Sequence, residues 1–305
     1  GNRNNHIGVP LSLLEVRDAT EVAVLEIGAN HIGETAFLSE LIAPQYGLIT
    51  NNGKDHLEGY GSVEGVKRGN AELYEYLHAH DGLAFVHADD AELMQMSTGL
   101  RQFTYGSQSG ADVRGELITA YPLVTVCVEQ VVIRTRLTGA YNFSNIMAAV
   151  AMGIYFNVPL AAIREALAAY EPRLNRSQVV EKDGNIFLMD AYNANPSSME
   201  AALRSFFDDP RGPKWVMLGD MAELGHATAV EHRAIVELLR SAPLAGGCLV
   251  GPAFGQADAE GHFLHFADVQ QLRQWYRQSG LRGYLVLVKG SRNQRLEGLF
   301  EETAS

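Results

Sequence analysis

The fold class is decided by the stretch Ile186-Phe187-Leu188-Met189-Asp190-Ala191-Tyr192-Asn193-Ala194-Asn195-Pro196-Ser197-Ser198-Met199. Its four leading apolar residues predict a buried strand, which ends at the carboxylate of Asp190. Asn195 is a suitable N-cap and Pro196 a suitable first residue for the helix that follows. Open α/β sheets bind ligands where buried strands end in polar turns of this kind. On turn chemistry alone, a ligand site and a purely structural Asp–Asn pair are equally compatible with the pattern.

Strands and helices alternate along most of the chain. In the C-terminal half the pattern predicts strands at 179–182, 186–190, 214–219, 247–251, 263–266 and 284–288, with helices at 197–207, 228–240 and 268–278. Thr228 and Glu231 have the spacing of a capping box for the helix at 228–240. In the N-terminal half it predicts strands at 22–28, 46–50, 83–86 and 102–104. Strands separated by helices at this spacing predict parallel sheets, so the fold class is α/β in both halves.

Two features divide the chain. From residue 113 to 137 apolar and polar residues alternate, which predicts a small antiparallel side sheet with one exposed face. The polar stretch Glu171-Pro172-Arg173-Leu174-Asn175-Arg176-Ser177 marks the expected domain boundary. A length of 305 residues suits two domains. We therefore expect one domain at 1–172 and a second at 173–305.

The composition narrows the class of protein. Hydrophobic residues make up 47% of the chain, enough to bury substantial cores, and the formal net charge of −12 argues against nucleic acid or an anionic membrane as the main partner. The two cysteines, Cys127 and Cys248, predict no disulfide framework. Neither a membrane-spanning apolar run nor a signal-peptide pattern occurs, so a soluble cytoplasmic protein is expected. Because the sequence starts at Gly1 rather than Met, we expect a processed, tagged or truncated polypeptide.

Glu26 and His56 both lie just beyond the ends of predicted strands. A carboxylate, an imidazole and phosphate oxygens form a suitable Mg²⁺ site, because Mg²⁺ takes few protein ligands and several substrate oxygens. A glutamate within an apolar strand needs a polar partner if it is buried. On spacing alone, a capping or core role for His56 is somewhat more common than a ligand role.

Lys289-Gly290-Ser291-Arg292 follows the predicted strand at 284–288. Two cations and a hydroxyl at a strand end suit a carboxylate or phosphate ligand. A surface turn with solvated charges fits the same residues equally well. Arg173 and Arg176 at the expected domain boundary leave the same two interpretations open.

Several well-known catalytic motifs are missing from the sequence. It contains no Gly-x-x-x-x-Gly-Lys-Ser/Thr loop, no Gly-x-Ser-x-Gly elbow, no His-Glu-x-x-His and no Cys-x-x-Cys. Serine hydrolase, zinc protease and thiol redox activities are therefore poorly supported.

Taken together, the motifs resemble the Mur ligase family, and within it the branch that adds D-alanyl-D-alanine. The matching segments are 1–10, 25–34, 56–62, 139–145, 175–178, 190–199, 218–225 and 289–292. They occur in family order and cover nearly all of the chain. The resemblance implies a parallel-sheet central domain that binds ATP, with a small antiparallel side sheet, and a Rossmann-like α/β C-terminal domain.

The resemblance also implies a reaction in peptidoglycan precursor synthesis. ATP phosphorylates the terminal carboxylate of UDP-N-acetylmuramoyl-tripeptide, and the amine of D-Ala-D-Ala attacks the resulting acyl phosphate. The protein positions the reactants and neutralises charge, as in other phosphoryl transfers. The implied cofactors are ATP and Mg²⁺, the implied partners are these small-molecule substrates, and the expected state is a monomer.

Each candidate site residue takes its role from this resemblance. Glu26 and His56 hold Mg²⁺. The residues that contact ATP are Asn51, Asn142, Asp190, Asn193, Asn195 and Arg176. The residues that lie near the UDP-sugar peptide or the incoming dipeptide are Asn4, Asn5, His31, Lys289, Ser291 and Arg292.

Three departures from the family pattern stand out. The N-terminal UDP-binding domain and the phosphate loop are absent, so this chain alone is expected to be inactive. Asn70 stands where the family has a carbamylated lysine that bridges to a metal, and Lys67, one turn earlier, is the candidate substitute. Asn52 stands where the family has an apolar residue.

Two alternatives to a D-alanyl-D-alanine ligase remain open on the sequence. A catalytically inactive binding module is favoured by Asn70, which cannot carry the charge of a carbamylated lysine. Another Mur-type amino-acid ligase is disfavoured by the Asn-Ala-Asn-Pro form at 193–196, where the other branches resemble Ala-His-x-Pro.

Overall fold

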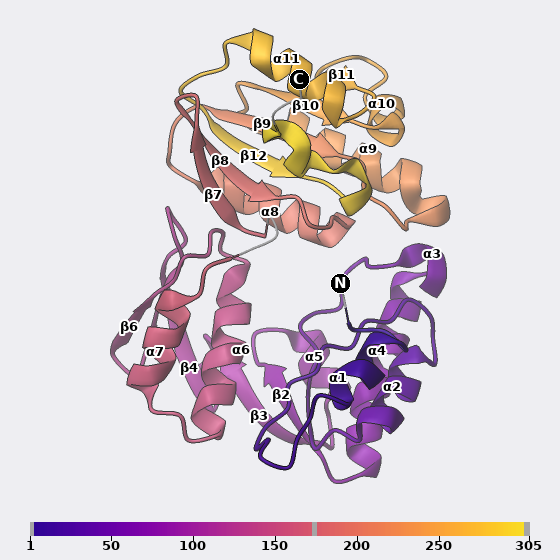
Figure 1. The fold of residues 1–305 in the computed structure, drawn as a ribbon, viewed down its shortest axis with the longest axis vertical. Coiled ribbons are helices and arrows are strands. Elements are labelled where there is room, and N and C mark those ends of the chain that lie inside the picture. Colours follow the sequence, from indigo (N-terminus) through magenta and orange to yellow (C-terminus); the bar gives the residue numbers. More distant parts are fainter. Residues whose placement is uncertain (1–2, 173–175, 302–305) are drawn as a thin grey trace. The chain divides into compact units, whose positions relative to one another are not determined.

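The computed structural model describes residues 3–172 and 176–301. The chain divides into two compact units, one of Gly1–Gly115 with Met147–Asn157 and one of Glu116–Ile146 with Val158–Ser305 (Figure 1). The expected domain boundary, the stretch 171–177, includes residues 173–175, which lie outside the described ranges. No helix in the described ranges is both long and apolar enough to cross a bilayer.

The first unit is built on a parallel sheet. Strands β1 (Tyr46–Leu48), β2 (Leu83–His87) and β3 (Arg101–Gly106) pair in sequence order, and β4 (Val113–Thr119) begins parallel to β3. The helices of this unit are α1 (Gly8–Leu13), α2 (Glu34–Ile42), α3 (Leu57–Tyr60), α4 (Val63–Ala79) and α5 (Ala91–Met96). Helix α6 (Asn142–Tyr155) has residues in both units.

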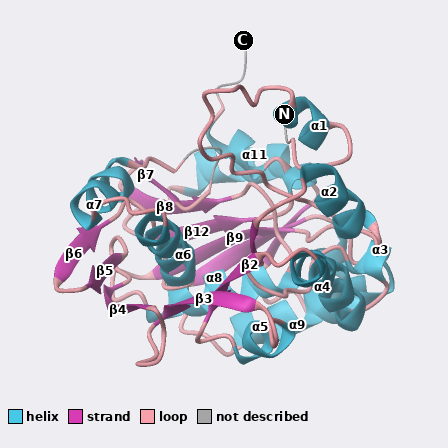
Figure 2. Cartoon of the chain, turned by 90° about the horizontal axis from the view of Figure 1, so that it is seen from below, coloured by secondary structure: helices cyan, strands magenta, loops and turns pink. Residues whose placement is uncertain are grey.

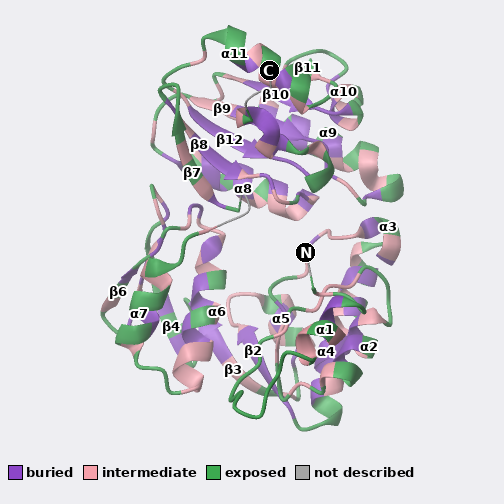
Figure 3. Ribbon diagram, in the orientation of Figure 1, coloured by how far each residue is buried: buried purple, intermediate pink, exposed green. Residues whose placement is uncertain are grey.

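The core of the first unit explains why these strands form. Phe85 is almost fully buried on β2, and its ring packs edge-on against Phe103 and Tyr155. Helix α4 begins at Val63, because Ser62 caps it by accepting the N–H of Gly65 at 3.0 Å. Figure 3 shows buried residues concentrated on the strands and on the inward helix faces.

The predicted strand at 22–28 is wrong. Residues 22–28 form no helix or strand, and Val24 is 84% exposed. The segment is apolar enough for a strand, but a strand also needs a neighbour that completes its hydrogen-bond ladder. Here the N–H of Gly28 donates instead to the carbonyl of Asn4 at 2.7 Å.

The antiparallel side sheet is confirmed. Strands β5 (Thr125–Val128) and β6 (Val131–Arg134) form a hairpin, and the hydrogen-bonded strand order continues from β4 to β5 and β6. Val126, Val128 and Ile133 are buried, whereas the residues next to them are more exposed, as the alternation predicts. Helix α7 (Leu160–Ala169) packs on β6.

The sheet of the second unit has the order β11-β10-β9-β12-β8-β7, of which Figure 2 shows β9, β12, β8 and β7 side by side. The bounds are β7 (Gln178–Lys182), β8 (Asn185–Asp190), β9 (Lys214–Gly219), β10 (Gly246–Val250), β11 (Leu264–Phe266) and β12 (Leu285–Lys289). All pairs are parallel except β7 with β8. The prediction of parallel pairing for strands separated by helices is confirmed, whereas β7 and β8, which no helix separates, form an antiparallel hairpin through the short turn at 183–184.

Helices cover both faces of this sheet. Phe187 and Met189 pack with Leu272 and Tyr276 of α11 (Val269–Ser279). Leu188, which points the other way on β8, lies with residues of α8 (Pro196–Asp208) around a cavity. The remaining helices are α9 (Thr228–Arg240), α10 (Pro252–Ala257) and the short 3₁₀ turns η1 (Gly225–Ala227), η2 (Arg292–Gln294) and η3 (Leu296–Phe300).

The capping box predicted at Thr228 and Glu231 does not form. The 3₁₀ turn η1 runs directly into α9, so Thr228 already has helical backbone angles. Its hydroxyl donates back to the carbonyl of Gly225 at 2.7 Å, and the residue at the N-cap position, Ala227, has no side chain that caps.

A buried Asp–His cluster joins β9, α9 and α10. Asp220 accepts the N–H groups of Ala253 and Phe254 at 2.9 and 2.8 Å. His232 is fully buried, and its Nε2 accepts the N–H of Met221 at 3.0 Å. Its Nδ1 lies 2.8 Å from the carbonyl of Thr228, so the neutral tautomer with the proton on Nδ1 satisfies both contacts.

We predict that this cluster makes stability pH-dependent. Burial lowers the pKa of His232 below the ordinary value of 6.5, although the Thr228 hydrogen bond and the charge of Asp220 oppose the shift. As the pH falls below this ordinary value of 6.5, His232 becomes protonated in the unfolded chain before it does in the folded chain. The unfolded chain then binds more protons, so the free energy of unfolding falls as the pH drops. His232→Gln should flatten this dependence in urea titrations. The exposed control His226→Gln should not, and equal slopes in all three proteins would contradict the assignment.

Candidate functional site

The carboxyl edge of the second sheet brings Asp190 and Lys289 together. The two residues are register partners at the ends of neighbouring parallel strands, β8 and β12. Lys289 is 2% exposed, and its Nζ donates to Asp190 Oδ2 at 2.6 Å and to the carbonyl of Asn193 at 3.3 Å. The resemblance predicted separate roles for them, at ATP and at the dipeptide. In the structure they form one buried ion pair.

The asparagine side chains in the turn after Asp190 form hydrogen bonds within the turn itself. Asn195 caps α8 by accepting the N–H of Ser198 at 2.7 Å, while Ser198 Oγ accepts the N–H of Asn195 at 3.1 Å. This is a capping box, and Pro196 occupies the first helical turn as predicted. Asn193 is exposed, and its Oδ1 accepts the N–H of Ala194 at 3.0 Å.

Tyr192 lies in the same turn, and the guanidinium groups of two arginines lie over its ring. The guanidinium carbon of Arg176 is 3.8 Å from the ring centroid, and that of Arg292 is 5.2 Å from it. Both distances lie within the range of cation–π interactions. Arg176 and Arg292, which the resemblance placed at the nucleotide and the dipeptide, therefore meet at one residue. Arg173 lies outside the described residues.

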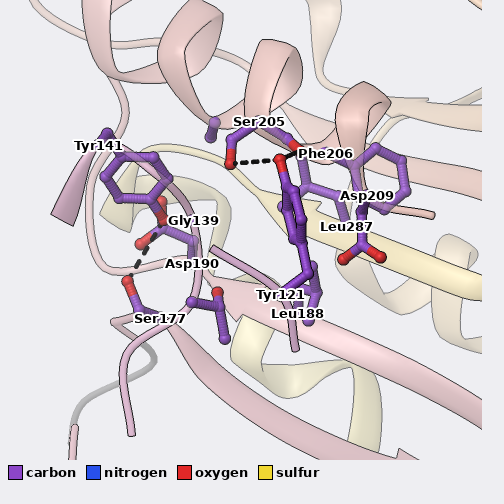
Figure 4. A pocket seen from close by; sticks show the side chains of 12 residues that line it. Tyr121, Gly139, Tyr141, Ser177, Leu188, Asp190, Ser205, Phe206, Asp209 and Leu287 are labelled. Atoms are coloured by element: carbon purple, nitrogen blue, oxygen red, sulfur yellow. Dashed lines mark hydrogen bonds between the residues drawn. The ribbon is translucent and has the colours of Figure 1, made fainter. Parts of the chain in front are cut away.

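A small cavity lies beside Asp190 (Figure 4). Its volume of about 20 Å³ has room for roughly one water molecule. Tyr141 and Ser177 line it, and their hydroxyl oxygens are 3.3 Å apart. Burial raises the pKa of Tyr141, and the negative charge of Asp190 raises it further, so this hydroxyl stays protonated. A cavity of this size cannot hold a substrate, and we interpret it as a small gap between packed side chains.

Other polar residues of the second unit, some of which line this cavity, are held by internal hydrogen bonds. Tyr121 donates its hydroxyl to the carbonyl of Ser205, and Ser205 Oγ accepts the N–H of Ala140 at 3.0 Å. Asn142, predicted to contact ATP, is buried, and its amide donates to the carbonyl of Thr138 at 2.7 Å. Ser291, predicted to lie near the dipeptide, is 2% exposed. Its backbone N–H donates to the carbonyl of Asp220 at 3.1 Å.

In the first unit the structure brings Asn4 and Glu26 together. Asn4 Nδ2 donates to Glu26 Oε1 at 2.9 Å, and both residues line an open depression of about 370 Å³. Gly28 permits this approach, because a Cβ at that position would lie 2.3 Å from Asn4 Nδ2. A depression of this size is in the range of small-molecule sites.

His56 lies at the start of α3 with left-handed backbone angles, φ 48° and ψ 38°. The neighbouring Asp55 has its pKa raised by burial, an effect that the charge of His56 partly offsets. Within the described residues no three His, Cys, Asp or Glu side chains gather closely enough to hold a metal by themselves. Glu26 is exposed rather than buried in a strand, so the burial argument for its partner does not apply.

The other predicted residues of this unit have local partners. Asn5 Oδ1 accepts the N–H groups of Ile7 and Gly8 at 3.1 and 2.9 Å, at the start of α1. His31 Nδ1 lies 2.7 Å from Asn30 Oδ1. Asn51 is exposed in the loop that follows β1.

Lys67, the candidate substitute for a carbamylated lysine, forms an ion pair with Glu92. Its hydrogen bond with Glu92 raises its pKa, which keeps the amine protonated, whereas carbamylation needs a neutral amine. Glu92 Oε2 also accepts Asn52 Nδ2 at 3.1 Å, and Asn70 Nδ2 donates to Asn52 Oδ1 at 2.9 Å. The two unusual asparagines therefore form one hydrogen-bonded chain that ends at Lys67.

Two residues of the second-unit edge, Tyr141 and Tyr192, were not among the candidate site residues expected from the sequence. Both occur inside quoted motifs, at 139–145 and 190–199. Tyr192 could have been noticed as an aromatic residue between Asp190 and Asn193 at a strand end. That two arginines distant in sequence share its ring required the tertiary structure.

Comparison with known proteins identifies relatives over nearly the whole chain. Residues 1–153 match the Mur ligase middle domain, and residues 175–292 match the domain described as "Mur ligase, glutamate ligase domain". The UDP-N-acetylmuramoyl-tripeptide–D-alanyl-D-alanine ligase of Bacillus subtilis is 30% identical over 99% of this chain and 68% of its own length. The Escherichia coli enzyme of the same name is 33% identical over 97% of this chain and 68% of its own length.

Solved structures agree with these matches. A crystal structure of MurF from Acinetobacter baumannii superposes with a TM-score of 0.84 at 29% identity, covering 98% of this chain and 68% of that one. MurF of Thermotoga maritima, solved in complex with ADP, gives a TM-score of 0.83 at 24% identity, covering 98% of this chain and 70% of that one. At that identity the second comparison supports the fold alone.

We predict that Lys289→Met lowers the free energy of unfolding by about 3 kcal/mol, because it leaves a partly buried carboxylate without its cation. Combining it with Asp190→Asn should recover much of this loss. Urea unfolding of the two single variants and the double variant measures the coupling between the residues. Lys214→Met, at the first residue of β9, is the control. A double variant no more stable than Lys289→Met would contradict the ion-pair assignment.

Asn195→Ala should cost about 1 kcal/mol of stability through loss of the α8 cap, whereas Asn195→Ser should retain most of it. The measurement is again urea unfolding. Equal losses of stability in the two variants would show that Asn195 stabilises the protein by a contact other than the helix cap.

Proposed function

Because the chain belongs to the Mur ligase family, we propose that it catalyses the addition of D-alanyl-D-alanine to UDP-N-acetylmuramoyl-tripeptide with consumption of ATP. The observation that carries this proposal is the 30% and 33% identity to two enzymes of that name over nearly the whole chain. The family places the chain in peptidoglycan synthesis as a ligase that uses ATP. We further propose a cytoplasmic, monomeric enzyme with one domain at 1–172 and a second at 173–305.

In the proposed reaction the terminal carboxylate of the tripeptide attacks the γ-phosphorus of ATP, which forms an acyl phosphate and releases ADP. The amine of the dipeptide then attacks the acyl carbon, and the tetrahedral intermediate expels inorganic phosphate as the amide forms and the amine loses its proton. These steps need charge neutralisation and alignment of reactants. The Arg176–Tyr192–Arg292 cluster and the Lys289–Asp190 pair supply fixed charges for these tasks.

Asp190 fits a role at the hydroxyl groups of the nucleotide. Lys289 binds Oδ2, and a carboxylate has a second oxygen with which to accept a ribose hydroxyl. Asn193 is exposed beside it and adds an amide to the same edge. Asn142 and Asn195 fit this role less well, because their side chains already satisfy contacts inside the protein.

Glu26 and His56 would hold Mg²⁺. Glu26 is exposed beside an open depression, and oxygen and imidazole donors with substrate phosphates suit this ion. When bound, Mg²⁺ would neutralise the phosphate charge of ATP. Asn4 positions Glu26 by donating to one of its oxygens. Among the proposed residue roles, the catalytic role of Lys67 has the least support from the contacts, because its protonated amine is paired with Glu92.

The test is phosphate release by the native polypeptide that contains residues 1–305. We expect release that requires ATP, UDP-N-acetylmuramoyl-tripeptide and D-Ala-D-Ala together, and that is lost when the dipeptide is replaced by a single amino acid. Glu26→Gln should lower kcat by at least about 100-fold, on the scale of losing an electrostatic catalytic contact. Glu40→Gln, exposed on α2, is the matched control and should leave kcat unchanged. Release that is indifferent to the dipeptide would contradict the proposed substrate.

A further inference from the structure

A carboxylate on helix α4 caps the neighbouring helix α2. Glu72 lies in the middle of α4 and is 9% exposed. Its Oε1 accepts the N–H of Gly33 at 2.6 Å, and its Oε2 accepts the N–H of Ala36 at 2.9 Å. Gly33 is the N-cap residue of α2, and Ala36 is the third residue of the helix, whose N–H an N-cap side chain commonly accepts. Because a glycine has no side chain that could cap, Glu72 supplies this contact from another helix.

The loop that leads into this cap, residues 29–33, is held at two further points. Glu34, in the first turn of α2, accepts the N–H groups of Asn30 and His31 with its Oε2 at 2.8 and 3.2 Å. The backbone of α3 abuts the loop, because a Cβ at Gly59 would lie 2.0 Å from the carbonyl oxygen of Asn30. Helices α2 and α3 both pack against α4 (Figure 2). Contacts from three helices therefore fix the loop.

The imidazole of His31 is exposed on this fixed loop, with 62% of its side chain accessible. Its Nδ1 lies 2.7 Å from Asn30 Oδ1, and because an amide oxygen only accepts, Nδ1 carries the proton in the neutral ring. Nε2 is then an acceptor, and it forms no hydrogen bond or ion pair within residues 3–172 and 176–301. An imidazole with a fixed tautomer and an unused acceptor suits a ligand that presents an N–H or O–H group.

We propose that Glu72 is a positioning residue for the UDP-sugar peptide, because it holds the loop that presents His31 to this substrate. The inference rests on the proposed function, whose substrate carries peptide N–H groups and sugar hydroxyl groups that His31 Nε2 can accept. Glu72 itself is buried, so its effect on the substrate passes through the loop.

The physical basis of this role is pre-organisation. Gly33 has left-handed backbone angles, with φ at 93°, and glycine populates other regions as readily. Without the Glu72 carboxylate, the N–H groups of Gly33 and Ala36 lose their acceptor, and the loop before α2 gains conformational freedom. A loop that is mobile before binding loses more conformational entropy when the ligand orders it, so affinity falls.

The experiment uses the native polypeptide that contains residues 1–305 and measures its affinity for UDP-N-acetylmuramoyl-tripeptide and for ADP by calorimetry. The variants are Glu72→Ala and Glu72→Gln, with Glu75→Ala, exposed on the same helix, as the matched control. We expect Glu72→Ala to lower affinity for the UDP-sugar peptide roughly tenfold, the effect of about one hydrogen bond, and affinity for ADP less than about twofold. Glu72→Gln keeps one acceptor oxygen, so its loss should be less than about threefold. Glu75→Ala should change neither affinity.

Two further measurements separate positioning from a purely structural role. His31→Ala should lower affinity for the UDP-sugar peptide, and adding Glu72→Ala should lower it no further, because both changes act through the same imidazole. Hydrogen–deuterium exchange of residues 29–36 should become faster in Glu72→Ala but not in Glu75→Ala. Circular dichroism checks that each variant is folded.

The outcomes separate this inference from the proposed function. Equal exchange of residues 29–36 in Glu72→Ala and the parent overturns the role of Glu72 in holding the loop. If phosphate release by the parent requires all three substrates but Glu72→Ala binds the UDP-sugar peptide as tightly as the parent, the proposed function stands and the positioning role is overturned. Losses that add in the double variant also overturn it. If the affinities change as expected but phosphate release is indifferent to the dipeptide, the positioning role stands and the proposed function is overturned.

Discussion

The buried ion pair between Lys289 and Asp190 is the interaction on which the second unit's sheet edge depends. A lysine that is 2% exposed costs several kcal/mol to desolvate unless a counter-charge meets it with good geometry. The parallel pairing of β8 with β12 places the two side chains as register partners, and the Nζ–Oδ2 distance is 2.6 Å. The same ammonium holds the carbonyl of Asn193, so the pair also sets the path of the turn.

Side-chain contacts at both ends fix the path of the turn between β8 and α8. At its start Lys289 holds Asp190, and at its end Asn195 and Ser198 close the capping box of α8. Tyr192 lies between these two fixed points, which keeps its ring in place for Arg176 and Arg292. A rigid turn that presents cations costs less conformational entropy on ligand binding than a mobile loop would.

The first unit uses hydrogen-bonded polar side chains in a similar way. Asn70, Asn52, Glu92 and Lys67 form a continuous chain of contacts. Asn70 and Asn52 are separate departures from the family pattern, but in the structure each is the hydrogen-bond partner of the other. Their joint effect is to bring a glutamate to Lys67, which raises the pKa of the lysine and keeps it a cation. Together they form a structural network in which the lysine is a charged member.

Local sequence features are enough to predict the α/β class, the strands of both sheets, the helices α8, α9 and α11, and the family. These follow from local periodicity, from turn residues such as Asn195-Pro196, and from motifs that are readable one segment at a time. Three further features follow from tertiary contacts: 22–28 is not a strand, β7 runs antiparallel, and Asp190 pairs with Lys289. Strand pairing depends on which neighbour completes the hydrogen-bond ladder, and that neighbour can lie anywhere in the sequence. The convergence of Arg176, Tyr192 and Arg292 has the same cause, since it follows from the direction of β7 and the order of β8 and β12 in the sheet.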